Sequence, residues 1–241
     1  MNRTVHTVGQ GSSPGKMRFR RHYYNVFSTF YDGFIRLHSR DTGEAMRSFL
    51  AETARLDQGC RVVDLCTGTG SSALRMVQED KVRVIGVDFS EGMLRQAQSK
   101  SLRGPACFWI RADATCLPIS PSSVDRVTCT YAMYELSGEA REKVLQEAER
   151  ILKPGGMFVM MEHLPPSHSF IKLLYLIRIY VMGTKGVRSF AGAEEKELAR
   201  FFDKIETVVA PGGRTKAVYG LKPPATERLP SGFIPGPRSR G

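Results

Sequence analysis

Cysteine is scarce in this chain, and the few that occur form no recognisable framework. Five cysteines stand among 241 residues, an odd number, and no two have Cys-x-x-Cys spacing, which argues against a disulfide scaffold. No grouping of His, Cys and Asp has metal-ligand spacing, so we expect no metal site. Cys66 and Cys129 fall inside apolar runs. We therefore interpret the cysteines as reduced core thiols of a cytoplasmic protein.

Long apolar runs are missing as well. No stretch reaches the roughly 18 uninterrupted apolar residues of a membrane span, and residues 1–16 hold no apolar run typical of a signal peptide. Acidic residues are fewer than basic ones, 24 against 35, for a net charge of +11. The basic excess gathers around residues 18–22 and 172–188. It favours an anionic partner, either nucleic acid or a membrane surface, with an unpartnered solvated face as the alternative.

The composition divides the chain into one domain and two tails. We expect residues 1–21 to be a disordered basic N-terminal segment and residues 223–241 a disordered proline-rich tail. The domain between them, residues 22–222, begins with two predicted helices over 23–38 and 40–56.

Short apolar runs then alternate with helical segments. Helices are predicted near 72–79, 91–100 and 139–152, and strands over Arg61–Thr67, Val82–Asp88, Cys107–Asp113, Val124–Ala132 and Met157–His163. Continuous apolar strands separated by helices are typical of a parallel sheet that is covered on both faces. The sequence therefore predicts a doubly wound α/β fold, in which ligands bind beyond the carboxyl ends of the strands.

A glycine-rich turn and three acids mark those strand ends. Gly68 and Gly70 follow the first strand, and Asp64, Asp88 and Asp113 lie at or near the ends of the first three strands. Asp88 has the spacing of a ribose-binding acid. Asp64 would repel a pyrophosphate and favour a ligand that carries an ammonium or a sulfonium. A cationic nucleoside therefore suits the turn better than a dinucleotide, and a nicotinamide-dependent oxidoreductase is disfavoured.

In this region the sequence resembles the class I S-adenosylmethionine-dependent methyltransferases. The resemblance rests on VVDLCTGTG, VIGVDFSEGML, IRADATCLP, VDRVTCTYAMYEL and ILKPGGMFVMMEH, in the family's order. It implies a Rossmann-like sheet of seven strands with an antiparallel last strand, closed by a hairpin of Glu206–Pro211 and Lys216–Lys222. It also implies that the cofactor S-adenosylmethionine contacts Asp64, Gly68, Thr69, Gly70, Asp88, Asp113, Ala114 and Thr130.

Within the class, the chain is similar to the C-methyltransferases of ubiquinone and menaquinone biosynthesis. FSTFYDGF matches that group's first helix, which implies that Tyr31 closes over the cofactor. After the fourth strand the quinone enzymes carry Phe-Gly-Ile-Arg-Asn, where this chain has Tyr-Ala-Met-Tyr-Glu at 131–135. The acceptor implied is a small, apolar or lipid-like molecule of the quinone or phospholipid type.

Candidate residues for the acceptor side follow from the ends of the fourth and fifth strands. Tyr134, Glu135 and His163 are the groups expected there, with Tyr134 and His163 as the catalytic candidates. FIKLLYLIRIYVM, residues 170–182, has one apolar stripe at helical spacing and basic flanks. This helical cap insertion is predicted to wall the acceptor pocket and to contact an anionic membrane surface peripherally, with an ordinary buried helix as the alternative.

Charge alone leaves one rival from another class, an RNA methyltransferase or other nucleic-acid-binding protein. The chain has no Asn-Pro-Pro-Tyr segment and no Pro-Cys dipeptide of the kinds used on nucleic-acid bases, and no appended RNA-binding domain is evident. A small-molecule acceptor is therefore favoured over nucleic acid.

Overall fold

The computed structural model describes residues 44–102, 107–164, 192–213 and 215–224. The predicted N-terminal tail, the predicted C-terminal tail from residue 225 on, the predicted helices over 23–38 and 170–182, and Tyr31 lie outside these ranges and stay predictions. Within the described residues, no helix is long and apolar enough to cross a membrane.

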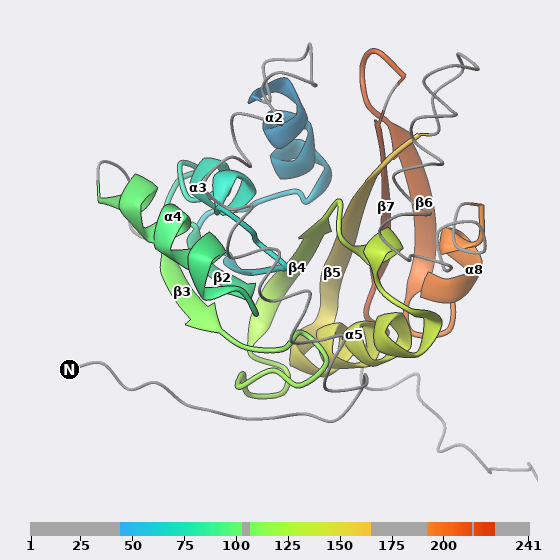
Figure 1. Cartoon of the computed structure of the whole chain (residues 1–241). Helices are drawn as coiled ribbons and strands as arrows, with labels where there is room; N and C mark the ends of the chain where they lie inside the picture. The colour runs from blue at the N-terminus through green and yellow to red at the C-terminus, as the bar shows by residue number, and fades with distance from the viewer. Residues whose placement is uncertain (1–43, 103–106, 165–191, 214, 225–241) are drawn as a thin grey trace, which may run out of the picture.

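A sheet of seven strands forms the centre of the molecule (Figure 1). Its order is β3-β2-β1-β4-β5-β7-β6. The strands are β1 (Arg61–Leu65), β2 (Arg83–Asp88), β3 (Phe108–Arg111), β4 (Val124–Thr130), β5 (Leu152–His163), β6 (Asp203–Val209) and β7 (Thr215–Leu221). The first five pair in parallel, whereas β7 runs antiparallel to both β5 and β6. The predicted doubly wound sheet with an antiparallel last strand is confirmed.

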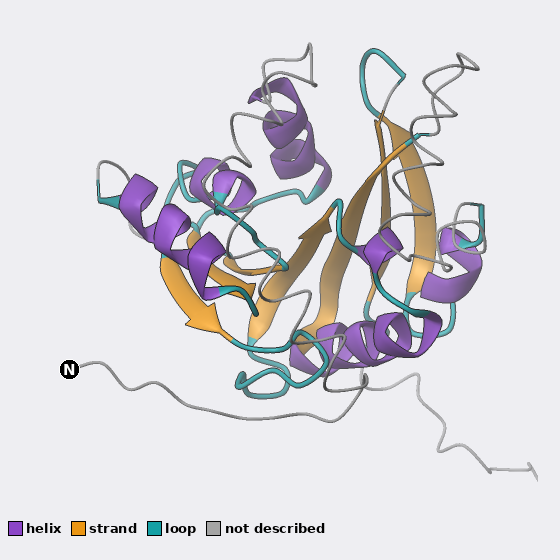
Figure 2. Cartoon of the chain, viewed as in Figure 1, coloured by secondary structure: helices purple, strands orange, loops and turns teal. Residues whose placement is uncertain are grey.

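Helices cover both faces of this sheet, as Figure 2 shows by colour. They are α2 (Glu44–Thr53), α3 (Ser71–Met76), α4 (Glu91–Ser101), the 3-10 turn η1 (Met133–Glu135), α5 (Gly138–Ile151) and α8 (Glu194–Leu198). Successive strand residues alternate between two apolar cores. Val62 belongs to the core that contains residues of α2 and α3, and Val63 to the core that contains residues of α5 and α8. This two-sided burial explains why the strands are apolar throughout.

Several strand boundaries differ from the prediction, and two of them have a clear structural cause. β1 ends at Leu65, because Cys66 turns left-handed at φ 52° and opens the following loop. β5 begins at Leu152, five residues before the predicted start at Met157. Gly155 donates from its amide to the Lys222 carbonyl at 2.9 Å, and the Lys222 amide donates to the Gly156 carbonyl at 2.8 Å. A Pro-Gly-Gly run is typical of a turn. Here the pairing with Lys222, directly after the end of β7, holds this run in the sheet.

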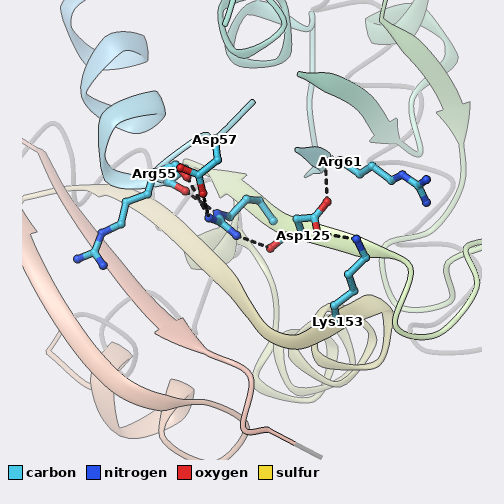
Figure 3. A network of polar contacts seen from close by, with 7 residues as sticks. Arg55, Asp57, Arg61, Asp125 and Lys153 are labelled. Atoms are coloured by element: carbon cyan, nitrogen blue, oxygen red, sulfur yellow. Dashed lines mark hydrogen bonds and ion pairs between the residues drawn. The ribbon is translucent and has the colours of Figure 1, made fainter. Parts of the chain in front are cut away.

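A polar cluster fixes the edge of the sheet at which the parallel strands begin, here called the amino edge (Figure 3). The Asp125 carboxylate accepts from the Arg61 amide at 2.9 Å and from the Lys153 ammonium at 2.6 Å, which joins the starts of three strands. Burial raises the pKa of Asp125, but the Lys153 ammonium and the Arg61 amide outweigh it, so the net pKa lies below the ordinary value.

Arg126 links the same edge to α2. Its guanidinium donates to the carbonyls of Ala54 at 2.7 Å, Arg55 at 3.0 Å and Asp125 at 3.0 Å, and to the Asp57 carboxylate at 3.2 Å. Two of these carbonyls follow the end of α2, where backbone acceptors lack partners within the helix. Arg126 therefore anchors α2 to the sheet on the side opposite the predicted ligand site.

Candidate active site

The loop after β1 is a compact turn in which several residues adopt left-handed conformations. Cys66, Gly68 and Gly70 have φ values of 52°, 56° and 74°. The Thr67 amide donates to the Val87 carbonyl at 3.0 Å, and the Gly70 amide donates to the Thr67 carbonyl at 3.0 Å. The turn is thereby tied to β2 and leads directly into α3, whose N-cap is Gly70.

The two predicted ligand glycines have different surroundings. A Cβ atom built on Gly68 would meet nothing within 4 Å, so this backbone borders open space. A Cβ on Gly70 would lie 2.5 Å from Cη2 of Trp109 and 2.8 Å from Cβ of Ala97. Gly68 therefore leaves room for a ligand, whereas the missing side chain of Gly70 makes room for an indole from β3 and for α4. The contact predicted between Gly70 and the cofactor would have to come from its backbone.

Asp64 lies under the turn, within β1, and its side chain is fully buried at 0% exposure. One carboxylate oxygen accepts from the Thr67 hydroxyl at 2.6 Å and the other from the Thr128 hydroxyl at 2.7 Å. Burial raises the pKa of Asp64 to about 6, against the opposing effect of the two hydroxyls. Because it is buried, Asp64 can act on a ligand only through its electric field or through Thr67. The attraction of Asp64 for an ammonium stays a prediction.

Asp88 ends β2 beside the same turn. Its carboxylate accepts from the Gly68 amide at 2.9 Å and from the Ser90 amide at 2.8 Å. Ser90 caps α4, and its hydroxyl accepts from the Met93 amide at 3.3 Å. The Phe89 amide also donates to the Asp88 carboxylate. Because two carboxylate oxygens offer about four acceptor positions, capacity remains for a ribose hydroxyl. Burial raises the pKa of Asp88 to about 6, so the group is ionised at neutral pH.

The remaining predicted cofactor residues lie at the ends of β3 and β4 or in the β1 turn. Asp113 follows β3 and accepts from the amide of Thr115 at 2.9 Å and from its hydroxyl at 2.8 Å. Ala114 beside it packs partly against the α5-side core. Thr130 ends β4 with its hydroxyl 3.5 Å from that of Ser72. Thr69 is buried within the turn. The fold thus brings these residues to one edge, the carboxyl edge, as expected for parallel strands.

Acids continue along this edge as far as β5. After burial, the pKa of Asp64 is raised by the charge of Asp88, and that of Asp88 by Glu135 of η1. Burial and the charge of Glu135 also raise the pKa of Glu162, near the end of β5, well above its usual value. Three of these residues, Asp64, Asp88 and Glu135, are called the carboxyl-edge acids. Glu162 is set apart from them, because its raised pKa favours the neutral form. The combined field of the carboxyl-edge acids favours a cationic ligand.

The acceptor-side candidates fall on different sides of the sheet. Tyr134 packs partly against the core under α5. His163 is exposed and stacks on Tyr131, with ring centroids 4.0 Å apart, and Tyr131 packs against the core under α2. Tyr131 itself holds a left-handed φ of 55°, an uncommon conformation for a bulky residue. The sequence pattern did not single out Tyr131 or Glu162 as site residues, although the acid directly after the apolar run MFVMM was a visible signal for Glu162.

Comparisons with known proteins agree with this geometry. A family model described as a methyltransferase domain matches residues 62–156. A ubiquinone/menaquinone biosynthesis C-methyltransferase from Geobacter sulfurreducens is 31% identical over 160 residues, which cover 64% of this chain and 62% of that protein. A demethylmenaquinone methyltransferase from Staphylococcus epidermidis is 30% identical over 176 residues, 72% of each chain.

The fold also matches solved methyltransferase structures. Phosphoethanolamine N-methyltransferase 2 of Haemonchus contortus, in complex with S-adenosyl-L-methionine, superposes with a TM-score of 0.63 at 16% identity, covering 85% of this chain and 58% of that one. Together with the glycine turn and the strand-end acids, these matches define a class I S-adenosylmethionine-dependent methyltransferase. Within that class, the chain belongs to the family of the demethylmenaquinone and ubiquinone/menaquinone C-methyltransferases.

Proposed function

We propose that this protein transfers a methyl group from S-adenosylmethionine to a small quinone-type acceptor. The observation that carries the proposal is the row of carboxyl-edge acids beside the open backbone of Gly68. A sulfonium nucleoside needs room along the turn and negative charge around it, and both occur together here. The relatives that are named for demethylmenaquinone supply the choice of acceptor.

One group of residues would hold the nucleoside part of the cofactor, and another group would hold its methionine part. Asp88 would accept from the ribose hydroxyls, and Asp113 and Ala114 would border the adenine. Thr130 would lie along the cofactor. The turn at Gly68–Gly70 would pass beneath the methionine part, whose ammonium the field of Asp64 would favour. When bound, the cofactor supplies an electrophilic methyl group on its sulfonium.

The protein's own contribution to the reaction is positioning and the exclusion of water. A ring carbon that gains a methyl group must lose a proton, so an acceptor of this type needs a base. His163, exposed at the end of β5 and oriented by its stack on Tyr131, is our candidate for that base. Tyr134 would contact the acceptor from η1.

A transfer assay tests the proposal. The purified protein is incubated with methyl-labelled S-adenosylmethionine and demethylmenaquinone in detergent micelles, with RNA in a parallel reaction. We expect the label in the organic phase, carried by a product one methyl group heavier by mass spectrometry. The Asp88→Asn variant is the control and should transfer little. Label in RNA alone, or no label in the quinone, would refute the quinone acceptor.

A further inference from the structure

Glu162 is a buried acid that the proposed reaction does not use. It is the penultimate residue of β5, only 4% exposed, and it points to the α5 face while its neighbour His163 lies on the other. Its Oε1 accepts from the Met133 amide at 3.1 Å, and its carboxyl also accepts from the Tyr134 amide. The carboxyl group therefore holds the backbone of η1 at two successive residues.

The second oxygen of Glu162 is unusual. Among the residues that the structure describes, Oε2 is the one buried side-chain oxygen or nitrogen without a hydrogen-bond partner. An unsatisfied buried carboxylate oxygen costs free energy, so such an atom in a native fold requires an explanation. A neutral carboxyl group lowers that cost, because it carries a proton in place of a charge.

Burial and the neighbouring acids favour this neutral form, and they outweigh the Met133 and Tyr134 amides, which favour the charged one. Glu135 of η1 and Glu194 of α8 add negative charge, and they raise the pKa of Glu162 further after burial has raised it. Lys216 of β7 stands opposite Glu162 in the strand register, but its ammonium pairs with Glu194 at 2.8 Å. Cys129 of β4 is fully buried nearby, and its hydrogen bond with Cys66 and its burial raise the pKa of its thiol, with a smaller contribution from Glu162. Within the described part of the chain, the charged groups near Glu162 are thus two acids and a lysine that is already paired.

We propose that Glu162 is a positioning residue of the acceptor half of the site, which as a neutral acid fixes η1 and so sets the placement of Tyr134 and Glu135. The two backbone bonds orient the turn that carries both side chains. Ionisation of Glu162 would place its charge against Glu135 and Glu194 and loosen the turn. The expected effect on turnover rests on the proposed function. The hydrogen bonds from the η1 amides to Glu162 do not depend on it.

Two substitutions separate the effect of the backbone hydrogen bonds to Glu162 from the effect of its ionisation. Glu162→Gln keeps an oxygen that accepts from both amides and cannot ionise. Glu162→Leu removes the acceptor while keeping an apolar side chain of similar reach. Hydrogen–deuterium exchange at the Met133 and Tyr134 amides measures these hydrogen bonds directly and needs no methyl acceptor. We expect both amides to exchange at least tenfold faster in the Leu variant and at the wild-type rate in the Gln variant.

Turnover of demethylmenaquinone measures the effect of the η1 position on catalysis. The Leu variant should lose at least tenfold in kcat/KM for this quinone, while its affinity for S-adenosylhomocysteine stays within twofold of wild type. The Gln variant should be active at neutral pH and should keep its activity at alkaline pH, where the wild type declines. Unchanged exchange in the Leu variant overturns the proposal, as does a Gln variant with the wild-type alkaline decline. If the wild type does not methylate demethylmenaquinone, the proposed acceptor fails, and the exchange rates still decide the role of Glu162. If the Leu variant does not fold, the Gln variant decides through its exchange rates and pH profile.

Discussion

The two edges of the sheet treat the same kind of residue in opposite ways. At the amino edge Asp125 lies between the Lys153 ammonium and the Arg61 amide, and its pKa is lowered. At the carboxyl edge Asp64 and Asp88 are buried beside other acids, and the pKa of each is raised to about 6. The first arrangement stabilises the fold, whereas the second costs stability and is typical of a site that awaits a cation.

This contrast has its largest expected effect at Asp88. Replacing Asp88 with Asn removes the charge and one acceptor for the ribose hydroxyls. We expect S-adenosylmethionine affinity to fall about 100-fold, since hydrogen bonds to a charged group contribute about 1.5–3 kcal/mol each. Isothermal titration calorimetry measures the change. Asp125→Asn at the amino edge is the matched control and should bind as wild type does. Equal losses in the two variants would show that the edges do not divide in function.

Arg126 offers the converse test at the amino edge. Its guanidinium is mostly buried, with the side chain 13% exposed, and it satisfies three carbonyls. Arg126→Met leaves those acceptors without their donor, so we expect the free energy of unfolding to fall by about 2–3 kcal/mol. Urea denaturation measures this fall. S-adenosylmethionine affinity should stay within twofold at a temperature where the variant is folded, and a large loss of affinity would contradict the division.

Acid pH should weaken cofactor binding through the carboxyl edge. Because Asp64 and Asp88 have pKa values of about 6, they become protonated below pH 6 and lose the charge that attracts a sulfonium. We expect the affinity to fall by about tenfold per pH unit below this value for one required ionisation. Calorimetry from pH 5 to pH 8 tests this, and a constant affinity over that range would refute it.

The same two groups affect stability with the opposite sign. Their folded pKa values lie above the ordinary value of 3.8, so the folded state holds their protons more tightly than the unfolded state. Their contribution to stability is therefore greatest below pH 3.8 and is lost as the pH rises through about 6. Protonation thus weakens cofactor binding over the same range in which it relieves the cost of the buried charge.

The sequence predicted the strand-end acids because a parallel sheet gathers its carboxyl ends at one edge. Asp64, Asp88 and Asp113 could be placed from the apolar runs alone. The packing of Trp109 against Gly70 could not, because it joins residues 39 positions apart in the chain through the tertiary fold. The sequence shows that Glu162 is an acid at the end of an apolar strand, but not that it bonds the η1 backbone, because only the folded chain brings those amides to it.

The smallest expected effects come from one substitution made at both edges. Asp64→Asn removes a buried charge, and the hydroxyls of Thr67 and Thr128 can rotate to suit an amide. We expect a gain of about 1 kcal/mol in the free energy of unfolding at neutral pH, because relief of desolvation exceeds what the imperfect hydrogen bonds lose. Asp125→Asn weakens a partly exposed ion pair and should cost about 0.5–1 kcal/mol. Urea denaturation of both variants at one pH gives the comparison. Changes of the same sign would mean that the carboxyl edge is as well compensated as the amino edge, and that its acids are not held in readiness for a cation.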